Sequence, residues 1–301
     1  MSDWKRTLAD LLREHNGTTT GGRTASAATR DKRSDVLFAA FAELRRTGVK
    51  LEDVRQFKGK HVKKLCEIWQ NRGLSASTLQ NNLSILRTFA GWIGKQGMVE
   101  TDEKYFHGAS ARTTINNTDK SWKSNSVDVE RKLAEVRAKD ERVALALELQ
   151  HAFGLRVKES LMLRPHFADQ GSVLDVSRGT KNGRPRVVPI DTPERRAAIE
   201  RAKAMCGRME SVAGNERALA QAKNHFYHVV RSCGIARENG IVPHGLRHEY
   251  ANDRFEEKTG TNSPVRGGNE LTREADYATR LEIAEELGHS REDVTTHYLG
   301  R

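Results

Sequence analysis

Apolar residues in the first hundred positions recur at intervals of three and four, the spacing of one face of a helix. Four helices are predicted in this part of the chain. They cover residues 4–13, 29–46, 61–70 and a segment that Ser75 or Ser77 caps and Gly94 ends. The stretch 17–26, rich in glycine, threonine and serine, indicates a flexible connection after the first helix.

The pattern changes further along the chain. Helices are predicted at 127–139, 141–153 and 156–163, followed by two short strands at 173–176 and 186–190. The dipeptide Asn182-Gly183 lies between these strands, and both residue types tolerate the positive φ of a type I′ turn, so the strands are expected to form a hairpin. Helical spacing returns at 193–205, 216–233, 248–257, 273–287 and 292–298.

The expected fold class is therefore mainly α, with one small antiparallel sheet. Residues 99–126 are polar and lack sustained periodicity, which is typical of a linker. We therefore expect an N-terminal helix and arm at 1–29, a helical domain at 30–98, the linker at 99–126 and a second domain at 127–301.

Composition narrows the class of protein. The chain has 301 residues, of which 37% are hydrophobic and 30% charged, as in ordinary globular proteins. No apolar run is long enough to span a bilayer, and the first residues lack a secretory signal, so no membrane partner is expected. Cys66, Cys206 and Cys233 are few and contain no Cys-x-x-Cys pair, which favours free thiols in a reducing cytoplasm.

The formal net charge is +11, and its distribution is uneven. The first hundred residues contain 18 lysines and arginines against 10 acidic residues. Such a basic N-terminal third favours a polyanionic partner, most simply duplex DNA, with a merely basic soluble surface as the alternative. Lys58, Lys60, Lys63 and Lys64, around the start of the third helix, are candidate phosphate contacts, with a solvated helix end as the alternative.

The residues with the most distinctive chemistry lie in the last sixty positions. His244, Arg247 and His248 are spaced to share a helix face, and an arginine is a fork of donors that grips phosphate. A zinc site is disfavoured because Arg247 falls between the two histidines and no HExxH glutamate is present. His289 follows a predicted helix end at Gly288, and Tyr298, a latent oxygen nucleophile, comes nine residues later.

Two further candidates precede this segment. Arg156 and Glu159 are three residues apart on a predicted helix, so the carboxylate can hold the guanidinium in position, although an ordinary surface ion pair has the same spacing. Lys181 lies in the predicted hairpin, where a lysine is usually solvated.

Taken in order, these residues resemble the tyrosine recombinase (phage integrase) family. The resemblance includes the Gly-Leu-Arg-x-x-Glu box that contains Arg156, a lysine in a hairpin, His-x-Leu-Arg-His, Leu-Gly-His-Ser and the nine-residue step to Tyr298. The N-terminal helices are similar to that family's core-binding domain, which has a SAM-like fold. The resemblance extends over about residues 30–301, and its ending is most similar to integrases of proteobacterial prophages and integrative elements.

The resemblance implies a role for each candidate. Tyr298 is expected to attack the scissile phosphate and form a 3′-phosphotyrosine, while Arg156 and Arg247 hold the non-bridging oxygens. Lys181 is expected to protonate the leaving 5′-oxygen. His244 is expected to assist proton transfer at the nucleophile, and His289 to donate to the phosphate. Glu159 is expected to orient Arg156, and His248 has a supporting role. Contacts with DNA are expected from Lys58, Lys60, Lys63, Lys64 and Arg87.

The resemblance also implies partners. Duplex DNA recombination sites, a dimer on each site and a tetramer on synapsis are expected, together with an accessory DNA-bending or directionality factor and a cytoplasmic, nucleoid-associated location. No cofactor is expected, neither ATP nor a metal ion. Two alternatives stay open: a nicking-closing enzyme of the type IB topoisomerase kind, and a DNA-binding protein without catalysis.

The chain departs from the family pattern at two places. His289 comes 45 positions after His244, a longer step than is usual in the family, and the excess corresponds to an inserted loop at 256–272. Only three residues follow Tyr298, whereas many relatives use a longer tail to contact the neighbouring subunit. We therefore expect any such exchange to use another element, and the inserted loop is the candidate.

Overall fold

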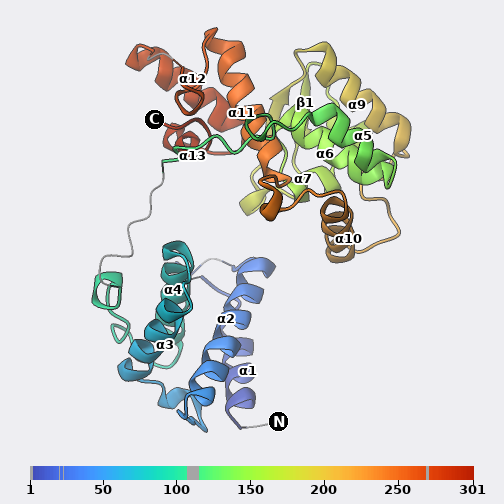
Figure 1. Ribbon diagram of the computed structural model, residues 1–301. Helices are drawn as coiled ribbons and strands as arrows, with labels where there is room; N and C mark the ends of the chain where they lie inside the picture. Colours follow the sequence, from blue (N-terminus) through green and yellow to red (C-terminus); the bar gives the residue numbers. More distant parts are fainter. Residues whose placement is uncertain (1–2, 20, 23, 107–114, 269–270) are drawn as a thin grey trace. The chain divides into compact units, whose positions relative to one another are not determined.

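The structure is a computed structural model that describes residues 3–19, 21–22, 24–106, 115–268 and 271–301. The chain forms two compact units, Met1–Thr113 and Thr114–Arg301 (Figure 1). The division lies within the segment 99–126 that the sequence pattern indicates as a linker. None of the helices in the described part of the chain combines the length and the apolar character needed to cross a membrane.

The first unit is helical. Its elements are α1 (Asp3–His15), α2 (Ala27–Arg46), η1 (Val54–Gln56), α3 (Gly59–Asn71), α4 (Ala76–Trp92) and η2 (Asp102–Lys104). Three buried rings centre its core: Phe41 lies 5.4 Å from both Phe57 and Phe89, measured between ring centroids. Ser75 is the cap of α4, because its side chain accepts a hydrogen bond from the backbone of Thr78 at 3.3 Å.

The first helix is part of this unit's core. Trp4, Leu8 and Leu11 of α1 are buried among the side chains of the other helices. In the glycine-rich connection that follows, the Thr18 carbonyl accepts a hydrogen bond from Arg33 at 2.8 Å. The N-terminal segment, which the sequence pattern separates from the first helical domain, thus packs with it.

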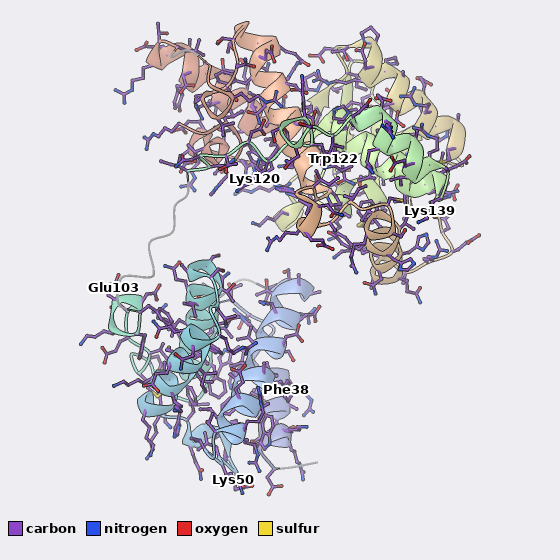
Figure 2. The ribbon with its side chains drawn as sticks, viewed as in Figure 1. Phe38, Lys50, Glu103, Lys120, Trp122 and Lys139 are labelled. Carbon is purple, nitrogen blue, oxygen red and sulfur yellow. The ribbon has the colours of Figure 1, made fainter. Side chains whose placement is uncertain are left out.

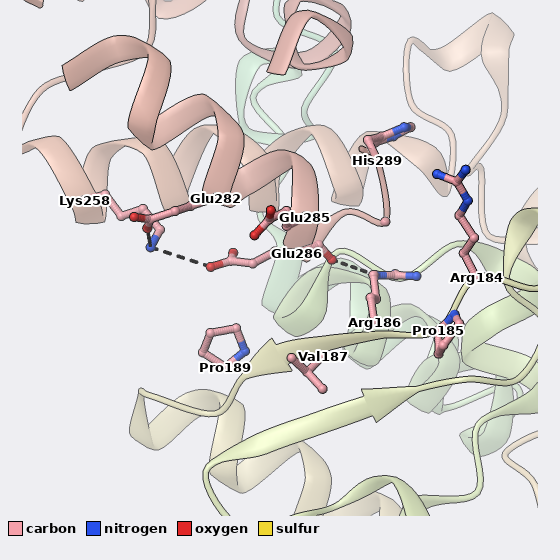
Figure 3. A pocket seen from close by; sticks show the side chains of 11 residues that line it. Arg184, Pro185, Arg186, Val187, Pro189, Lys258, Glu282, Glu285, Glu286 and His289 are labelled. Atoms are coloured by element: carbon pink, nitrogen blue, oxygen red, sulfur yellow. Dashed lines mark hydrogen bonds and ion pairs between the residues drawn. The ribbon is translucent and has the colours of Figure 1, made fainter. Parts of the chain in front are cut away.

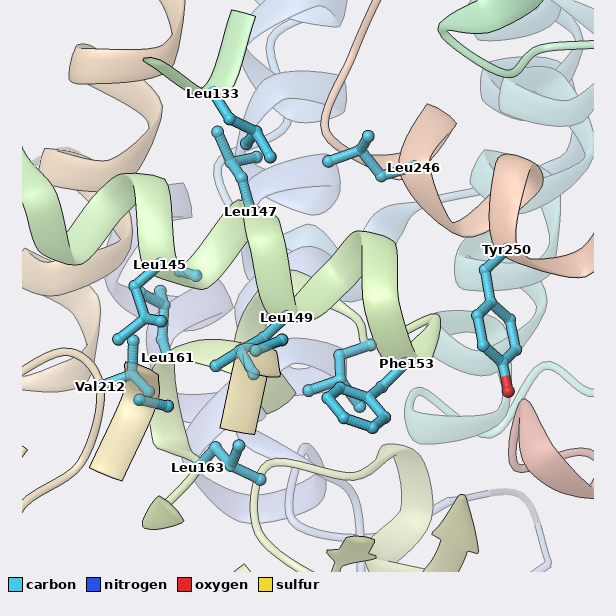
Figure 4. Close-up of a cluster of buried hydrophobic side chains, with 14 of the residues drawn as sticks. Leu133, Leu145, Leu147, Leu149, Phe153, Leu161, Leu163, Val212, Leu246 and Tyr250 are labelled. Atoms are coloured by element: carbon cyan, nitrogen blue, oxygen red, sulfur yellow. The ribbon is translucent and has the colours of Figure 1, made fainter. Parts of the chain in front are cut away.

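The second unit is also mainly helical. Its elements are η3 (Lys123–Asn125), α5 (Val129–Arg137), α6 (Glu141–Phe153), α7 (Val157–Met162), α8 (Pro165–Ala168), β1 (Val173–Val176), η4 (Lys181–Gly183), β2 (Arg186–Pro189), α9 (Pro193–Met205), α10 (Leu219–Ser232), η5 (Arg237–Asn239), α11 (His244–Thr259), η6 (Pro264–Arg266), α12 (Arg273–Glu286), η7 (Glu292–Thr295) and α13 (Thr296–Leu299). Helix α6 is buried along most of its length, with Leu147, Leu149 and Phe153 in the same apolar cluster as Leu246 and Tyr250 of α11 (Figure 4).

Part of the expected linker belongs to this unit. Trp122, which Figure 2 labels, is fully buried. Its indole N–H donates to the Val242 carbonyl at 2.8 Å. Its backbone N–H donates to the Glu249 carboxylate at 3.1 Å. The segment leading into α5 is therefore fixed against α11.

The two strands pair as expected, but their turn differs from the expectation. β1 and β2 are antiparallel, with Val176 opposite Arg186. The connection between them is a longer loop that contains the 3-10 turn Lys181–Gly183. Because Val176 pairs with Arg186 and residues 177–185 lie between them, the expected two-residue type I′ turn is wrong. The loop lies close to α7: a Cβ added at Gly179 would lie 2.7 Å from the Lys158 carbonyl oxygen.

The last helical segment begins where expected, as η7 at Glu292, and its cap position, Arg291, makes no side-chain hydrogen bond. Helix α11 begins four residues earlier than expected, at His244, and runs into the inserted segment as far as Thr259.

Gly154 lies where α6, α11 and α12 meet. It ends α6 with φ +60°, and an added Cβ would lie 2.6 Å from Tyr250 Cδ1 and 2.9 Å from Leu287 Cδ2. Gly171 also has a positive φ, +81°, but an added Cβ there would meet nothing within 4 Å. Substitution at Gly171 therefore tests backbone strain alone, whereas substitution at Gly154 tests strain together with packing.

We predict that Gly154→Ala lowers the free energy of unfolding by about 2–4 kcal/mol, because left-handed strain and overpacking add. Gly171→Ala should cost only about 1–2 kcal/mol, from strain alone. Urea denaturation of both variants measures the difference. Equal losses at the two positions would contradict the close packing at Gly154.

Candidate active site

Arg156 lies at the junction between α6 and α7. Because Gly154 turns the chain, Arg156 becomes the residue that precedes α7. Its backbone N–H and its Nη1 each donate to Glu159 at 2.8 Å, and its Nη2 donates to the Leu287 carbonyl at 3.3 Å. The guanidinium is therefore held on one side by a carboxylate three residues later.

Arg186, which the sequence analysis does not single out, completes this arrangement. Its Nη1 and Nη2 donate to the two carboxylate oxygens of Glu159 at 3.0 and 2.8 Å, and its Nε donates to the Glu286 carbonyl at 2.7 Å. Figure 3 shows Arg186 on the edge of β2, with the bond to Glu286 drawn as a dashed line. An arginine at an inward position of a strand, two residues before buried Val188, is the signal in the sequence that identifies it.

Glu159 is a buried anion between two cations. Its side chain is fully buried, which by itself would raise its pKa, but the bonds and charges of Arg186 and Arg156 outweigh burial and lower the pKa to about 2. The carboxylate is therefore ionised at neutral pH and fixes both guanidiniums.

Arg247 is the central cation of the site. It lies in the first turn of α11, is fully buried, and donates from Nε to the Tyr298 hydroxyl at 3.1 Å. Its Nη1 donates to the Gly154 carbonyl and its Nη2 to the Leu287 carbonyl. Burial, together with nearby positive charge, lowers its pKa to about 10, so it remains charged at neutral pH.

The guanidiniums of Arg156 and Arg247 converge on one oxygen. The Leu287 carbonyl accepts from Nη2 of each. Two donors of neighbouring arginines therefore lie close enough to hold a single oxygen atom, with the Tyr298 hydroxyl bonded to one of the same guanidiniums.

Three histidines surround the Tyr298 ring. The ring centroids of His244, His248 and His289 lie 6.0, 4.9 and 6.3 Å from that of Tyr298. Burial, reinforced mainly by positive neighbours, lowers the pKa of His244 to about 4 and those of His248 and His289 to about 3. All three imidazoles are therefore neutral at pH 7 in the free protein.

The contacts of the histidines differ. His289 Nε2 lies 3.5 Å from Arg156 Nη2. His248 Nδ1 is buried without a hydrogen-bond partner among the described residues. His248 thus has an unused nitrogen next to the tyrosine.

Lys181 stands apart from this cluster. It is exposed on the turn between β1 and β2 and has no hydrogen bond or ion pair within the described residues. Its charge is nevertheless close enough to be among those that lower the pKa of His289.

The basic candidates for DNA contact belong to the first unit, whereas the cluster around Tyr298 belongs to the second. Lys58, Lys60, Lys63 and Lys64 are exposed around the start of α3, where Lys64 forms a 3.7 Å ion pair with Glu67. Arg87 is engaged within its own unit, because Nη2 donates to Asp102 at 2.7 Å and to the Glu100 carbonyl at 2.6 Å.

One group in the described residues has side chains suited to a metal ion. Ligand atoms of His151, Glu249 and Asp253 lie within 4.8 Å of one another. Both carboxylates already have donors: Glu249 accepts from the Trp122 backbone at 3.1 Å, and Asp253 accepts from Arg266 at 2.6 Å. Both carboxylates therefore already accept hydrogen bonds from within the protein.

A phenol beside two arginines that share an oxygen is suited to phosphoryl transfer through tyrosine, because the cations can neutralise the charge that builds on a phosphate. Comparison with known proteins agrees. A family model described as "Integrase" matches residues 111–253, and one described as "Phage integrase, N-terminal" matches residues 10–99.

Curated relatives and solved structures extend the comparison. The chain is 27% identical over 247 residues to tyrosine recombinase XerC of Xanthomonas campestris pv. campestris, covering 76% of this chain and 70% of the relative. XerC of Xanthomonas axonopodis pv. citri is 26% identical over 248 residues, with 75% and 73% covered.

Among solved structures, a lambda integrase dimer bound to a COC′ core site has a TM-score of 0.61 at 15% identity, covering 98% of this chain and 94% of that one. The XerH site-specific recombinase bound to a palindromic difH substrate has a TM-score of 0.53 at 14% identity, with 99% and 85% covered. These structures share the fold. The chain belongs to the tyrosine recombinase (phage integrase) family and is an enzyme that breaks and rejoins DNA.

We predict that Arg186→Met lowers the free energy of unfolding by about 3–5 kcal/mol, because it leaves the buried Glu159 carboxylate with one partner fewer. The sign of the pH dependence follows from the depressed pKa. The Glu159 contribution is complete above its ordinary pKa of 4.5 and is lost as pH falls toward about 2. The loss caused by Arg186→Met should therefore be largest at neutral pH and should shrink below pH 4.5.

Urea denaturation between pH 3 and pH 7 tests this on wild type, Arg186→Met and the double variant Glu159→Gln/Arg186→Met. The double variant removes both charges and should recover part of the lost stability. A deficit that is the same at every pH would mean that Arg186 acts through packing alone.

Proposed function

We propose that the enzyme is a site-specific recombinase that integrates or excises a mobile element through a 3′-phosphotyrosine on Tyr298. The observation that carries the proposal is the 3.1 Å contact of Arg247 Nε with the Tyr298 hydroxyl, inside a cluster that also contains Arg156 and three neutral histidines. The match of residues 10–99 to the phage integrase N-terminal model supports recombination over a nicking-closing topoisomerase.

The proposed reaction proceeds in one displacement. The Tyr298 oxygen bonds to phosphorus, the bond from phosphorus to the 5′-oxygen breaks, and the 5′-oxygen leaves as a hydroxyl. Arg156 and Arg247 hold the non-bridging oxygens, whose charge rises in the transition state. The N–H groups of Arg156 and Arg247 that now donate to the Leu287 carbonyl and the Tyr298 hydroxyl would donate to the phosphate instead. Its arrival therefore frees the tyrosine hydroxyl for attack.

Two protons move in this step. His244 is assigned to help remove the tyrosine proton, with His248 in support. Burial and positive neighbours lower the pKa of both imidazoles in the free protein, and the negative charge of a bound phosphate would raise their basicity. Lys181 is assigned to protonate the leaving oxygen, and its exposed position on a turn is consistent with a residue that must reach DNA. His289 is assigned to donate to the phosphate once Arg156 has turned from it to the DNA.

Duplex DNA is the proposed partner. Its proposed contacts in the first unit are the exposed lysines around the start of α3, with Arg87 becoming available if it leaves Asp102. Related structures are described as dimers and as a tetramer bound to a Holliday junction, and we extend this assembly, one dimer per site and a tetramer on synapsis, to the present chain. An accessory DNA-bending or directionality factor is part of the same proposal.

The covalent intermediate provides the first test. Sheared genomic DNA from the source cells is nicked lightly with DNase I, which is then stopped with EDTA, so that a strand cleaved next to a nick loses its short end and traps the adduct. We predict a denaturation-resistant adduct with wild type and with Tyr277→Phe, an exposed tyrosine of α12, but none with Tyr298→Phe. The linked strands should resist a 3′-exonuclease and remain open to a 5′-exonuclease.

Sequencing the trapped DNA distinguishes the alternatives. A recombinase should yield one recurrent motif, whereas a topoisomerase-like enzyme should yield dispersed sites. An adduct that persists in Tyr298→Phe would refute Tyr298 as the nucleophile. DNA binding without any adduct would instead indicate a binding protein.

The proton donor provides the second test. Lys181→Ala should slow cleavage of the recovered site by about 10²-fold or more, because the 5′-oxygen would leave without a proton. A substrate with sulfur in place of that oxygen needs no protonation, since a thiolate is a good leaving group, and should restore the rate. Lys158→Ala, an exposed lysine of α7, is the control for lost charge and should cut both substrates in an unchanged ratio. Equal slowing of both substrates by Lys181→Ala would remove Lys181 from this role.

A further inference from the structure

The inserted segment contains a tight turn, residues 263–268, that packs in its own unit against the helix that bears Tyr298. Backbone bonds from Arg266 and Gly268 to the Ser263 carbonyl, 2.9 and 3.0 Å long, close this turn. It faces three things: the segment 115–121, α11 and α13. We call it the 263–268 turn.

Arg266 ties the turn to two separate elements. Its Nε donates to Asp119 at 2.9 Å, its Nη1 to Asp253 of α11 at 2.6 Å, and its Nη2 to Ser121 at 3.4 Å. The Arg266 side chain is only 12% exposed, and Asp119 only 11%. The pair with Asp119 is therefore protected and contributes more than a surface pair does, whereas Asp253 is 36% exposed.

Ser263 connects the turn to the tyrosine. Ser263 and Asn252 are both fully buried, and the serine hydroxyl donates to the Asn252 side-chain carbonyl. The Asn252 amide then donates to the backbone carbonyls of His248 at 2.7 Å and Tyr298 at 3.3 Å. One asparagine thus holds both a proposed proton-transfer residue and the proposed nucleophile, and Ser263 fixes its orientation.

The residues around Tyr298 are held by the same surroundings. The Thr296 carbonyl accepts from the Asn116 backbone at 3.0 Å, and the Gly300 carbonyl accepts from Arg280 at 3.0 Å. Gly300 fits against the turn so closely that an added Cβ would lie 3.1 Å from Val265 Cβ.

We infer that the 263–268 turn, through Arg266 and Ser263, is a positioning element that sets the backbone of Tyr298 for attack. Among the described residues, no hydrogen bond or ion pair joins the turn to the Tyr298 hydroxyl or to the arginines of the cluster, so the turn acts through Asn252 and the ends of α13. This inference rests on the proposed function for its effect on cleavage. Its effect on the packing of α13 does not depend on that function.

Two measurements test the inference on the full chain. The first is hydrogen exchange of the peptide that contains residues 294–301 in the free protein. Arg266→Ala and Ser263→Ala should each speed its exchange about tenfold or more, because the contacts that close α13 are weakened. Arg201→Ala removes an ion-paired arginine of α9 instead and should leave this peptide unchanged.

The second measurement is the single-turnover rate of adduct formation at saturating DNA. Since a displacement of about 1 Å at a reacting group can cost about 10²-fold, Arg266→Ala should lower this rate by about 10–100-fold while DNA binding stays within about twofold. Arg266→Lys keeps the charge but not the fork, and should recover part of the rate. Arg201→Ala should react at the wild-type rate.

The outcomes separate the two proposals. Unchanged exchange of 294–301 in both variants overturns the inference whatever the enzyme does, and so does faster exchange with an unchanged rate. A loss that appears only in DNA binding also overturns it. An absence of adduct with wild type counts against the proposed function, while the exchange experiment still decides whether the turn holds α13.

Discussion

The second unit contains a buried guanidinium without a carboxylate bonded to it. Arg247 is enclosed, charged at neutral pH, and bonded to two backbone carbonyls and a phenol. A buried charge of this kind is costly unless its donors are all occupied. The chain therefore supplies oxygens from three distant places: Gly154 at the end of α6, Leu287 at the end of α12, and Tyr298 on α13. The architecture around the site follows from this requirement.

Positive charge exceeds negative charge around Arg247. Arg156 and Arg186 share the single carboxylate of Glu159, so three guanidiniums are balanced by one buried acid in the bonds described above. Burial keeps the histidines neutral, and nearby positive charge adds to this effect, because a proton added to any of them would be desolvated and also repelled. An arriving phosphate would supply the missing negative charge. The same imbalance that destabilises the empty site therefore favours phosphate over a neutral ligand.

Much of this could be predicted from the sequence, for local reasons. The helix spacing and the i, i+3 relation of Arg156 to Glu159 are short-range features, and the structure places Arg156 and Glu159 together. Arg186 could not be predicted so readily from the sequence, because its partner Glu159 lies 27 residues away. Only the packing of β2 against α7 and α12 brings the two together. The turn at Lys181 differs from the prediction for a related reason. Asn-Gly favours a tight hairpin locally, but the approach of Gly179 to the Lys158 carbonyl draws the loop out.

The inserted segment illustrates the same limit and adds a physical point. Its glycines and proline indicate a loop, and nothing local reveals that Ser263 is fully buried or that Arg266 spans two acidic residues. Once these contacts are formed, the segment has little freedom to reach a neighbouring subunit, because doing so would expose Asp119 and Asp253 to each other without their shared cation and leave Asn252 without the serine that orients it. An exchange between subunits through this segment would therefore have to break the support of the tyrosine at the moment of cleavage. Contacts within the chain and contacts between subunits compete for the same side chains, and the burial of Ser263 favours those within the chain.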